Sequence, residues 1–181
     1  MYKKVAIYIT VIALTGLVFA GVSFAKNPAH GKVPDGQAGN SRISHAYFNE
    51  KDPDTWEIVE DGAWGKMRYS HEAADFSFNF NGHGLEPGMA YTLIYYPDPW
   101  PGSGLICLGD GIACIDGNIH IKNTVDTGDL PLMNDENYPD GAKIWLVLTS
   151  DVDCVMQEMI GWNPVEYLFE YNLITFDDTD F

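Results

Sequence analysis

From residue 56 onward, the hydrophobic positions of the chain recur with a period of two. Phe76, Phe78 and Phe80 alternate with polar residues, a pattern typical of a strand with one buried face. Similar strands are predicted at residues 91–96, 119–122 and 167–173, shorter ones at 66–69, 105–108 and 112–115, and one buried on both faces at 142–149. About eight strands separated by Gly, Pro and Asp turns predict an all-β fold, a single Greek-key β-sandwich over residues 56–181.

The first 25 residues have the three-part pattern of a secretory signal peptide. Lys3 and Lys4 supply the positive start, an apolar run follows, and Ser23 and Ala25 stand at positions −3 and −1 of a cleavage site. The alternative is an uncleaved anchor, because residues 5–25 are long enough to span a bilayer. Both interpretations indicate a secreted or cell-surface protein.

Residues 26–55 are rich in Gly, Pro, Asn and Asp and offer little to bury, so we expect a flexible N-terminal arm. Cleavage after residue 25 leaves eight basic residues against 26 acidic ones, a net charge of −18. Such a surface repels nucleic acid, anionic lipid and anionic polymers. No later apolar stretch is long enough to cross a membrane, so no insertion is expected after cleavage.

Three cysteines follow the signal segment, and an export compartment permits a disulfide. Asp116-Gly117 is a favoured two-residue hairpin loop, which would place Cys114 opposite Ile119 on the apolar face. Cys114 is therefore predicted to be a free core thiol. We predict a disulfide between Cys107 and Cys154, with a Cys107–Cys114 bridge as the alternative.

The segment Leu85-Glu86-Pro87-Gly88-Met89-Ala90-Tyr91 enters a predicted strand with the spacing Leu-x-Pro-x-x-x-Tyr. It resembles the tyrosine corner of Greek-key sandwiches, including fibronectin type III and Ig-like modules. The resemblance covers residues 80–91 and implies an Ig-like sandwich. It also implies a structural role for Tyr91, whose hydroxyl would bond a backbone group just upstream.

Two further segments have a broader resemblance. The sequences Tyr-Tyr-Pro-Asp-Pro-Trp-Pro-Gly at 95–102 and Gly-Trp-Asn-Pro-Val-Glu-Tyr-Leu-Phe-Glu-Tyr at 161–171 are similar to segments of uncharacterised secreted β-sandwich proteins of archaea and bacteria. The likeness implies secretion and transfers no activity to any residue.

Acidic clusters recur in the predicted loops, as in Asp151-x-Asp153, which follows the strand at 142–149. Calcium needs six to eight oxygen ligands, and such loops can supply carboxylates and carbonyls. If calcium binds, we expect it at Asp151 and Asp153; the alternative is solvated turn residues. The five histidines lack the i, i+4 or H-x-H spacing of a transition-metal site, so we expect them to be scattered surface residues.

The loop Pro97-Asp98-Pro99-Trp100-Pro101-Gly102 is the best candidate for a binding surface. Its prolines stiffen the backbone, so Trp100 is held at little entropic cost, with Asp98 and Tyr96 beside it. The alternative is that Trp100 folds back and caps the end of the sandwich.

No catalytic or cofactor signature is present, and a G-x-S-x-G nucleophile elbow is absent from the sequence. We therefore expect a non-catalytic, extracellular binding or cell-surface module, with no cofactor unless calcium binds. Its partner would be a protein or glycan at the cell exterior. The alternatives are a calcium-stabilised structural or adhesion domain and a secreted hydrolase that uses paired loop carboxylates.

Overall fold

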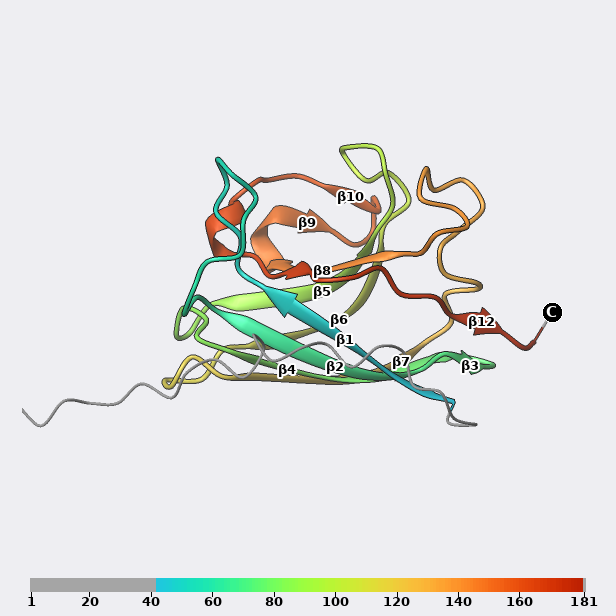
Figure 1. Ribbon diagram of the computed structural model, residues 1–181, viewed down its shortest axis with the longest axis horizontal. Helices are drawn as coiled ribbons and strands as arrows, with labels where there is room; N and C mark the ends of the chain where they lie inside the picture. Colours follow the sequence, from blue (N-terminus) through green and yellow to red (C-terminus); the bar gives the residue numbers. More distant parts are fainter. Residues whose placement is uncertain (1–41, 181) are drawn as a thin grey trace, which may run out of the picture.

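The computed structural model describes residues 42–180 (Figure 1). Within this range the chain is almost entirely β-structure, with no α-helix and two short 3₁₀ turns, η2 (Thr149–Asp151) and η3 (Pro164–Glu166). Seven longer strands are β1 (Ile43–Asn49), β2 (Trp64–Ser70), β4 (Phe76–His83), β5 (Ala90–Tyr96), β6 (Ile106–Ile112), β7 (Ile119–Val125) and β8 (Lys143–Leu148). Five two-residue strands are β3 (Glu72–Ala73), β9 (Val152–Asp153), β10 (Glu158–Met159), β11 (Phe169–Glu170) and β12 (Asp177–Asp178). The predicted all-β class is confirmed.

The larger sheet has the order β11-β1-β2-β4-β7, with every neighbouring pair antiparallel. Its inner face carries the aromatic residues predicted from the sequence, because Phe76, Phe78 and Phe80 are all buried on β4. Ile119 and Ile121 are likewise buried on β7. The period-two pattern therefore identified both strands and the side of each that faces the core.

The smaller sheet, β6-β5-β8, packs face to face on the larger one. Gly109 and Gly111 make the close approach possible: a Cβ at either position would lie 3.0 Å from Ile121 or 3.2 Å from Ile119 of the opposite sheet. Tyr91 pairs with Gly111 in the register of β5 and β6 and is fully buried on the same side.

The other face of the smaller sheet is also covered. In Figure 1, β9 and β10 lie beyond β5 and β8, on the side away from β1, β2 and β4. The predicted burial of the 142–149 strand on both faces is confirmed, since Trp145 and Val147 are buried as well as Ile144, Leu146 and Leu148. This extra layer holds the loops that form the candidate site.

The predicted arm at residues 26–55 is wrong at its C-terminal end. Residues 43–49 form β1, a full strand that pairs with β2 along its whole length and buries Ala46 and Phe48. The apolar alternation of this strand is short and follows a Gly- and Pro-rich stretch, which concealed it. The ordered domain thus begins before residue 56, while residues 26–41 and the predicted signal peptide at 1–25 lie outside the described residues.

The predicted hairpin at Asp116-Gly117 is also wrong. A tight turn is present, because the Gly117 N–H donates to the Cys114 carbonyl at 2.9 Å. However, β6 belongs to the smaller sheet and β7 to the larger one, so the chain crosses between sheets and no strand forms at 113–115. Cys114 is free, as predicted, but it is exposed and is not a core residue.

The predicted alternation at residues 167–173 holds over two residues only. Tyr167, Leu168 and Phe169 are buried in succession, and Tyr171 is exposed. The chain closes one edge of the sandwich here, because Leu168 bridges to Leu146 of β8 while Phe169 and Glu170 pair with β1. A segment that contacts both sheets buries successive side chains, so buried and exposed positions do not alternate along it.

No helix among residues 42–180 has the length and apolar character needed to span a bilayer.

Candidate functional site

Four of the five tryptophans of the chain meet in one cluster of aromatic rings. They come from four separate segments: the β1–β2 loop, the β5–β6 loop, strand β8 and the loop after β10. We call this the aromatic cluster; its members are Trp56, Tyr96, Trp100, Trp145, Trp162, Tyr167 and Phe169.

Trp162 is the centre of the cluster. Its ring centroid lies 5.1 Å from that of Trp100, 6.3 Å from Trp56 and 6.2 Å from Trp145. It also makes an edge contact with Tyr167 at 5.6 Å. Aromatic pairs in this distance range contribute about 0.5–1.5 kcal/mol each beyond their buried area, so Trp162 couples the segments to one another.

The cluster is buried at its base and open at its surface. Trp145 is 7% exposed and stacks on Tyr96 with centroids 3.9 Å apart, whereas Trp56, Trp100 and Trp162 are 50%, 53% and 40% exposed. We call these last three the tryptophan patch. These three indoles lie on a buried aromatic base that already fills the space beneath them, so they keep part of their apolar surface in solvent.

Trp56 is held in a backbone conformation that large residues rarely adopt. Its φ is +60°, in the left-handed region. The loop is fixed by Asp52, whose carboxylate accepts the N–H groups of Asp54 and Thr55 at 2.9 Å and whose carbonyl accepts that of Trp56 at 2.8 Å. Strain of this kind is retained where the surrounding structure enforces it, often at functional sites.

Trp100 sits on a compact turn that closes over Tyr96. The Gly102 N–H donates to the Pro99 carbonyl at 2.9 Å, and Gly102 itself has φ +71°. A Cβ on Gly102 would lie 2.4 Å from the Tyr96 ring, so only glycine fits between the turn and that ring. Trp100 packs at 6.4 Å from Tyr96 and keeps half of its surface in solvent, so its binding role and the capping alternative both stay predictions.

The other two predicted binding residues have internal partners. Tyr96 is 2% exposed, and burial raises the pKa of its phenol to about 12. The Asp98 carboxylate accepts hydrogen bonds from Lys143 Nζ and from Asn137 Nδ2. Burial opposes the ionisation of Asp98, but these two donors outweigh it and lower its pKa. Both residues therefore lie beneath or beside the patch, with Trp100 as the exposed member of the three.

A second acidic residue, Asp135, also holds the Trp100 loop in place. Asp135 is buried and accepts the Tyr95 hydroxyl at 2.6 Å and the Asn137 N–H at 2.9 Å. It also accepts the Asp98 N–H at 3.3 Å, which fixes the start of the Trp100 loop. The 131–141 segment and the Trp100 loop are thus joined through hydrogen bonds to carboxylates, which are stronger than neutral ones.

Asp151 orders the segment that carries Trp162. Its buried carboxylate accepts the Tyr167 hydroxyl at 2.5 Å and Asn163 Nδ2 at 2.8 Å, and its carbonyl accepts the N–H groups of Ile160 and Gly161. A Cβ on Gly161 would lie 2.5 Å from this carboxylate, which shows how closely the chain approaches. Trp162 is flanked on both sides by residues bound to Asp151.

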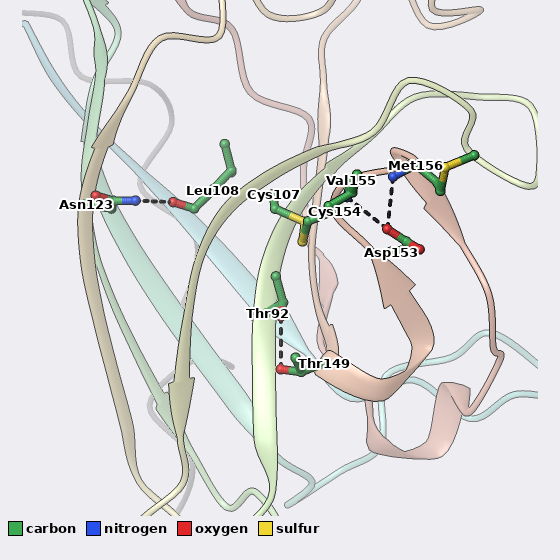
Figure 2. The surroundings of a disulfide bond; sticks show 9 residues. All are labelled: Thr92, Cys107, Leu108, Asn123, Thr149, Asp153, Cys154, Val155 and Met156. Carbon is green, nitrogen blue, oxygen red and sulfur yellow. Dashed lines mark hydrogen bonds between the residues drawn. A yellow bond between two sulfur atoms is a disulfide. The ribbon is translucent and has the colours of Figure 1, made fainter.

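The calcium ligands predicted at Asp151 and Asp153 are occupied by protein donors. Asp153 accepts the N–H groups of Val155 and Met156, both at 2.9 Å (Figure 2). Among residues 42–180 no group of three or more His, Cys, Asp or Glu side chains is arranged to hold a metal ion. The calcium site stays a prediction without support from these contacts.

The predicted disulfide between Cys107 and Cys154 is confirmed, with Cα atoms 5.7 Å apart. Figure 2 shows that it joins β6 to the loop between β9 and β10. Beside it, the Gln157 carbonyl accepts the Gly104 N–H at 2.9 Å, and the Pro101 carbonyl accepts that of Met159 at 3.4 Å. The segment of β5, β6 and the Trp100 loop is therefore linked, covalently and through its backbone, to the β9–β10 segment that precedes Trp162.

A carboxylate also lies at the base of the cluster beside Trp145: Glu170 accepts a hydrogen bond from Trp145 Nε1. Burial raises the pKa of Glu170, and the nearby Lys51 opposes that shift. The Lys51 ammonium lies 5.7 Å from the centroid of the Phe169 ring, in cation–π range. Glu170 thus accepts the hydrogen bond that the buried indole N–H of Trp145 needs. The alternative of a hydrolase with paired loop carboxylates stays a prediction.

The sequence identified Trp100 but missed Trp56 and Trp162, which are 106 positions apart. Both stand in loops beside Asp, Asn or Pro, in Asp54-Thr55-Trp56 and Trp162-Asn163-Pro164. A large indole in a polar turn was the available signal, because such a residue has no predicted strand face on which to be buried. Their proximity depends on packing between distant segments.

The backbone contact predicted for Tyr91 is present: the Glu86 N–H donates to the Tyr91 hydroxyl at 3.2 Å. Tyr91 is fully buried, and the same turn is closed by Gly88, with φ +80°. The structure itself is all-β with several sheets.

The chain matches no protein-family model, no curated protein and no solved structure.

Proposed function

We propose that this protein is a secreted, non-catalytic binding module at the cell exterior, and that the tryptophan patch is its contact surface. The observation that carries the proposal is the convergence of three half-exposed tryptophans from three loops. Large contiguous apolar patches on the surface of a monomeric protein mark interaction sites. The segment that carries Trp162 adds exposed Ile160 and Val165 close to it in the sequence.

The patch is built for binding with little loss of conformational entropy. Indole has only two side-chain torsions, and each of these three rings is packed against at least one other ring of the cluster. The loops beneath are fixed by a disulfide, by Asp52 and by Asp151. Preorganisation of this kind raises affinity by lowering the cost of association.

We infer that the ligand is an uncharged glycan. Indole faces pack well against the apolar C–H faces of sugar rings, and three rings offer more than one such contact. The chain carries a net charge of −16, which disfavours anionic ligands at long range. A protein partner is the other occupant that an apolar aromatic surface suits, and the test below separates the two.

The proposed topology beneath the site is Greek-key and Ig-like. Strands β4 and β7 are neighbours in the larger sheet, whereas β5 and β6, which lie between them in sequence, pair in the other sheet. This crossover and the Tyr91–Glu86 contact support it. The loops at one end of such sandwiches are a common place for binding sites.

A neutral-glycan array tests the function. The exported protein should bind at least one uncharged oligosaccharide, and Trp100→Ala should abolish that binding. Trp64→Ala is the matched control, because Trp64 is the one tryptophan outside the cluster and contacts His83 on β2–β4. Equal loss in both variants would contradict the assignment, as would capture of a protein partner through Trp100 without any glycan binding.

A further inference from the structure

The four long strands of the larger sheet carry no acidic residue. The chain has 26 Asp and Glu residues, yet none falls in β1, β2, β4 or β7. Three of the basic residues lie there instead: Lys66, Arg68 and Lys122. In a chain of net charge −16, this sheet face has the opposite sign to the rest of the molecule.

The register of the sheet lines these cations up with polar groups in two rows across the outer face. Directly paired residues place Tyr47, Lys66, Asn81 and His120 in one row, and His45, Arg68, Asn79 and Lys122 in the next. We call these eight residues the basic face. With strands about 4.8 Å apart, each row is about 14 Å long.

The cations of the basic face are not neutralised within the described part of the chain. The ion pairs between residues 42 and 180 are Arg42–Glu72 and Lys143–Asp98, so no carboxylate lies within 4.0 Å of Lys66, Arg68 or Lys122. Burial, and then the charges of Lys66 and Arg68, lower the pKa of His45, as expected in a positive local field. Unpaired cations are unusual where acidic residues are so abundant.

The groups between the cations are suited to hydroxyl-rich ligands. His120 Nδ1 lies 2.9 Å from Asn81 Oδ1, which fixes the amide orientation, and Lys66 Nζ lies 5.4 Å from the centroid of the Tyr47 ring. Asn79 and Asn81 offer both donors and acceptors, so they can bond sugar hydroxyls while the cations bond carboxylates.

We propose that the basic face binds an acidic polysaccharide, a polymer of uronic acid type, with Arg68 and Lys122 pairing with its carboxylates. The site is separate from the tryptophan patch and does not depend on it. Charge complementarity supports this occupant. At physiological ionic strength the screening length is about 8 Å, so the acidic residues farther away act only weakly on a polymer bound at the three cations.

A folded protein partner, including a second copy of this chain, fits the face less well. Protein interfaces concentrate aromatic and apolar anchors at their centres and exclude charged residues from them. The centre of this face is formed by Lys66, Arg68, Asn79 and Asn81, all polar. A flexible polymer that hydrogen bonds along two rows needs no apolar centre.

Binding of the exported protein to immobilised polygalacturonate tests the proposal, with uncharged dextran as the reference polymer. The double variant Arg68→Gln/Lys122→Gln should bind polygalacturonate about tenfold more weakly, since two exposed ion pairs are removed. Arg42→Gln is the matched control, because Arg42 is already paired with Glu72 and lies outside the face. It should bind within about twofold of the parent.

Three results would overturn the proposal: equal binding of parent and double variant, no preference for polygalacturonate over dextran, or equal binding of single-stranded DNA, which would indicate a general polyanion surface. Dimerisation that the double variant loses, without polysaccharide binding, would assign the face to a second copy. Trp100→Ala should keep its polygalacturonate binding, so failure of the glycan function at the patch and failure here are distinguishable.

Discussion

The hydroxyl of Tyr167 donates a 2.5 Å hydrogen bond to the buried carboxylate of Asp151, across the segment that carries Trp162. Asn163 completes the arrangement, because its side-chain amide donates to the same carboxylate oxygen and its N–H donates to the Tyr167 hydroxyl at 3.1 Å. An exposed tryptophan is thus positioned by a buried polar network.

Tyr167→Phe should test that network. The ring is kept while the Asp151 carboxylate loses one donor, so the free energy of unfolding should fall by about 2 kcal/mol, as for hydrogen bonds to charged groups. Urea denaturation measures the change. Tyr171→Phe is the control, because Tyr171 is exposed and should cost less than about 0.5 kcal/mol. Equal stability of the two variants would mean that the hydrogen bond between Tyr167 and Asp151 does not stabilise the Trp162 segment.

Calcium should leave the melting temperature unchanged. A ligand that binds only the folded state raises the melting temperature by mass action, but the carboxylates of Asp151 and Asp153 already accept protein hydrogen bonds. Melts in EDTA and in millimolar calcium check this. A rise in calcium that Asp151→Asn/Asp153→Asn abolishes would instead establish the calcium-stabilised alternative.

The disulfide should contribute about 4 kcal/mol in the chain-entropy model, because it joins residues 47 positions apart. Cys107→Ser/Cys154→Ser should therefore unfold at markedly lower urea concentration. It should also weaken binding at the patch, since β6, which follows the Trp100 loop, loses its covalent link to the β9–β10 loop that precedes Trp162. Cys114→Ser controls for loss of a thiol, because Cys114 is exposed and free. A double variant as stable as Cys114→Ser would refute the stabilising role.

The features that could be predicted from the sequence are those that depend on neighbouring residues. Alternation predicted Phe76, Phe78 and Phe80 on the inner face of β4, and the Leu-x-Pro-x-x-x-Tyr spacing predicted a hydrogen bond between the Tyr91 hydroxyl and a backbone group just upstream. The errors arose where the outcome depends on distant segments. The hairpin predicted at Asp116-Gly117 puts Cys114 in the core, but the chain changes sheets at that turn and Cys114 is exposed. The aromatic cluster depends on four segments that meet only after both sheets have formed.

Alkaline pH should destabilise the protein through its buried tyrosines. Burial raises the pKa values of Tyr95 and Tyr167 above the usual 10.0, and Asp135 and Asp151 respectively add to the shift; burial also raises the pKa of Tyr96, to about 12. The folded state therefore keeps protons that the unfolded chain releases. The associated stability is complete below pH 10 and falls as pH rises above it, with the contribution of Tyr96 lost at about pH 12.

Urea midpoints measured across that pH range would show the loss, and the tyrosinate absorbance of the native protein would lag behind that of the unfolded chain. Tyr95→Phe should flatten the decline, because it removes one of the shifted groups. An unchanged midpoint up to pH 12 in the parent protein would show that these phenols are not protected by the fold.

Truncation of one buried and one half-exposed tryptophan of the aromatic cluster, Trp145 and Trp100, should separate stability from binding. Trp145 is almost fully buried, stacks on Tyr96 and donates to Glu170, so Trp145→Ala should destabilise by roughly 3–5 kcal/mol. Trp100 keeps half of its surface in solvent, so Trp100→Ala should cost about 1 kcal/mol, between the values for exposed and buried sites. Urea denaturation of both variants gives the comparison. If Trp100→Ala is as unstable as Trp145→Ala, Trp100 serves the core rather than a ligand, and the tryptophan patch loses its central evidence as a binding surface.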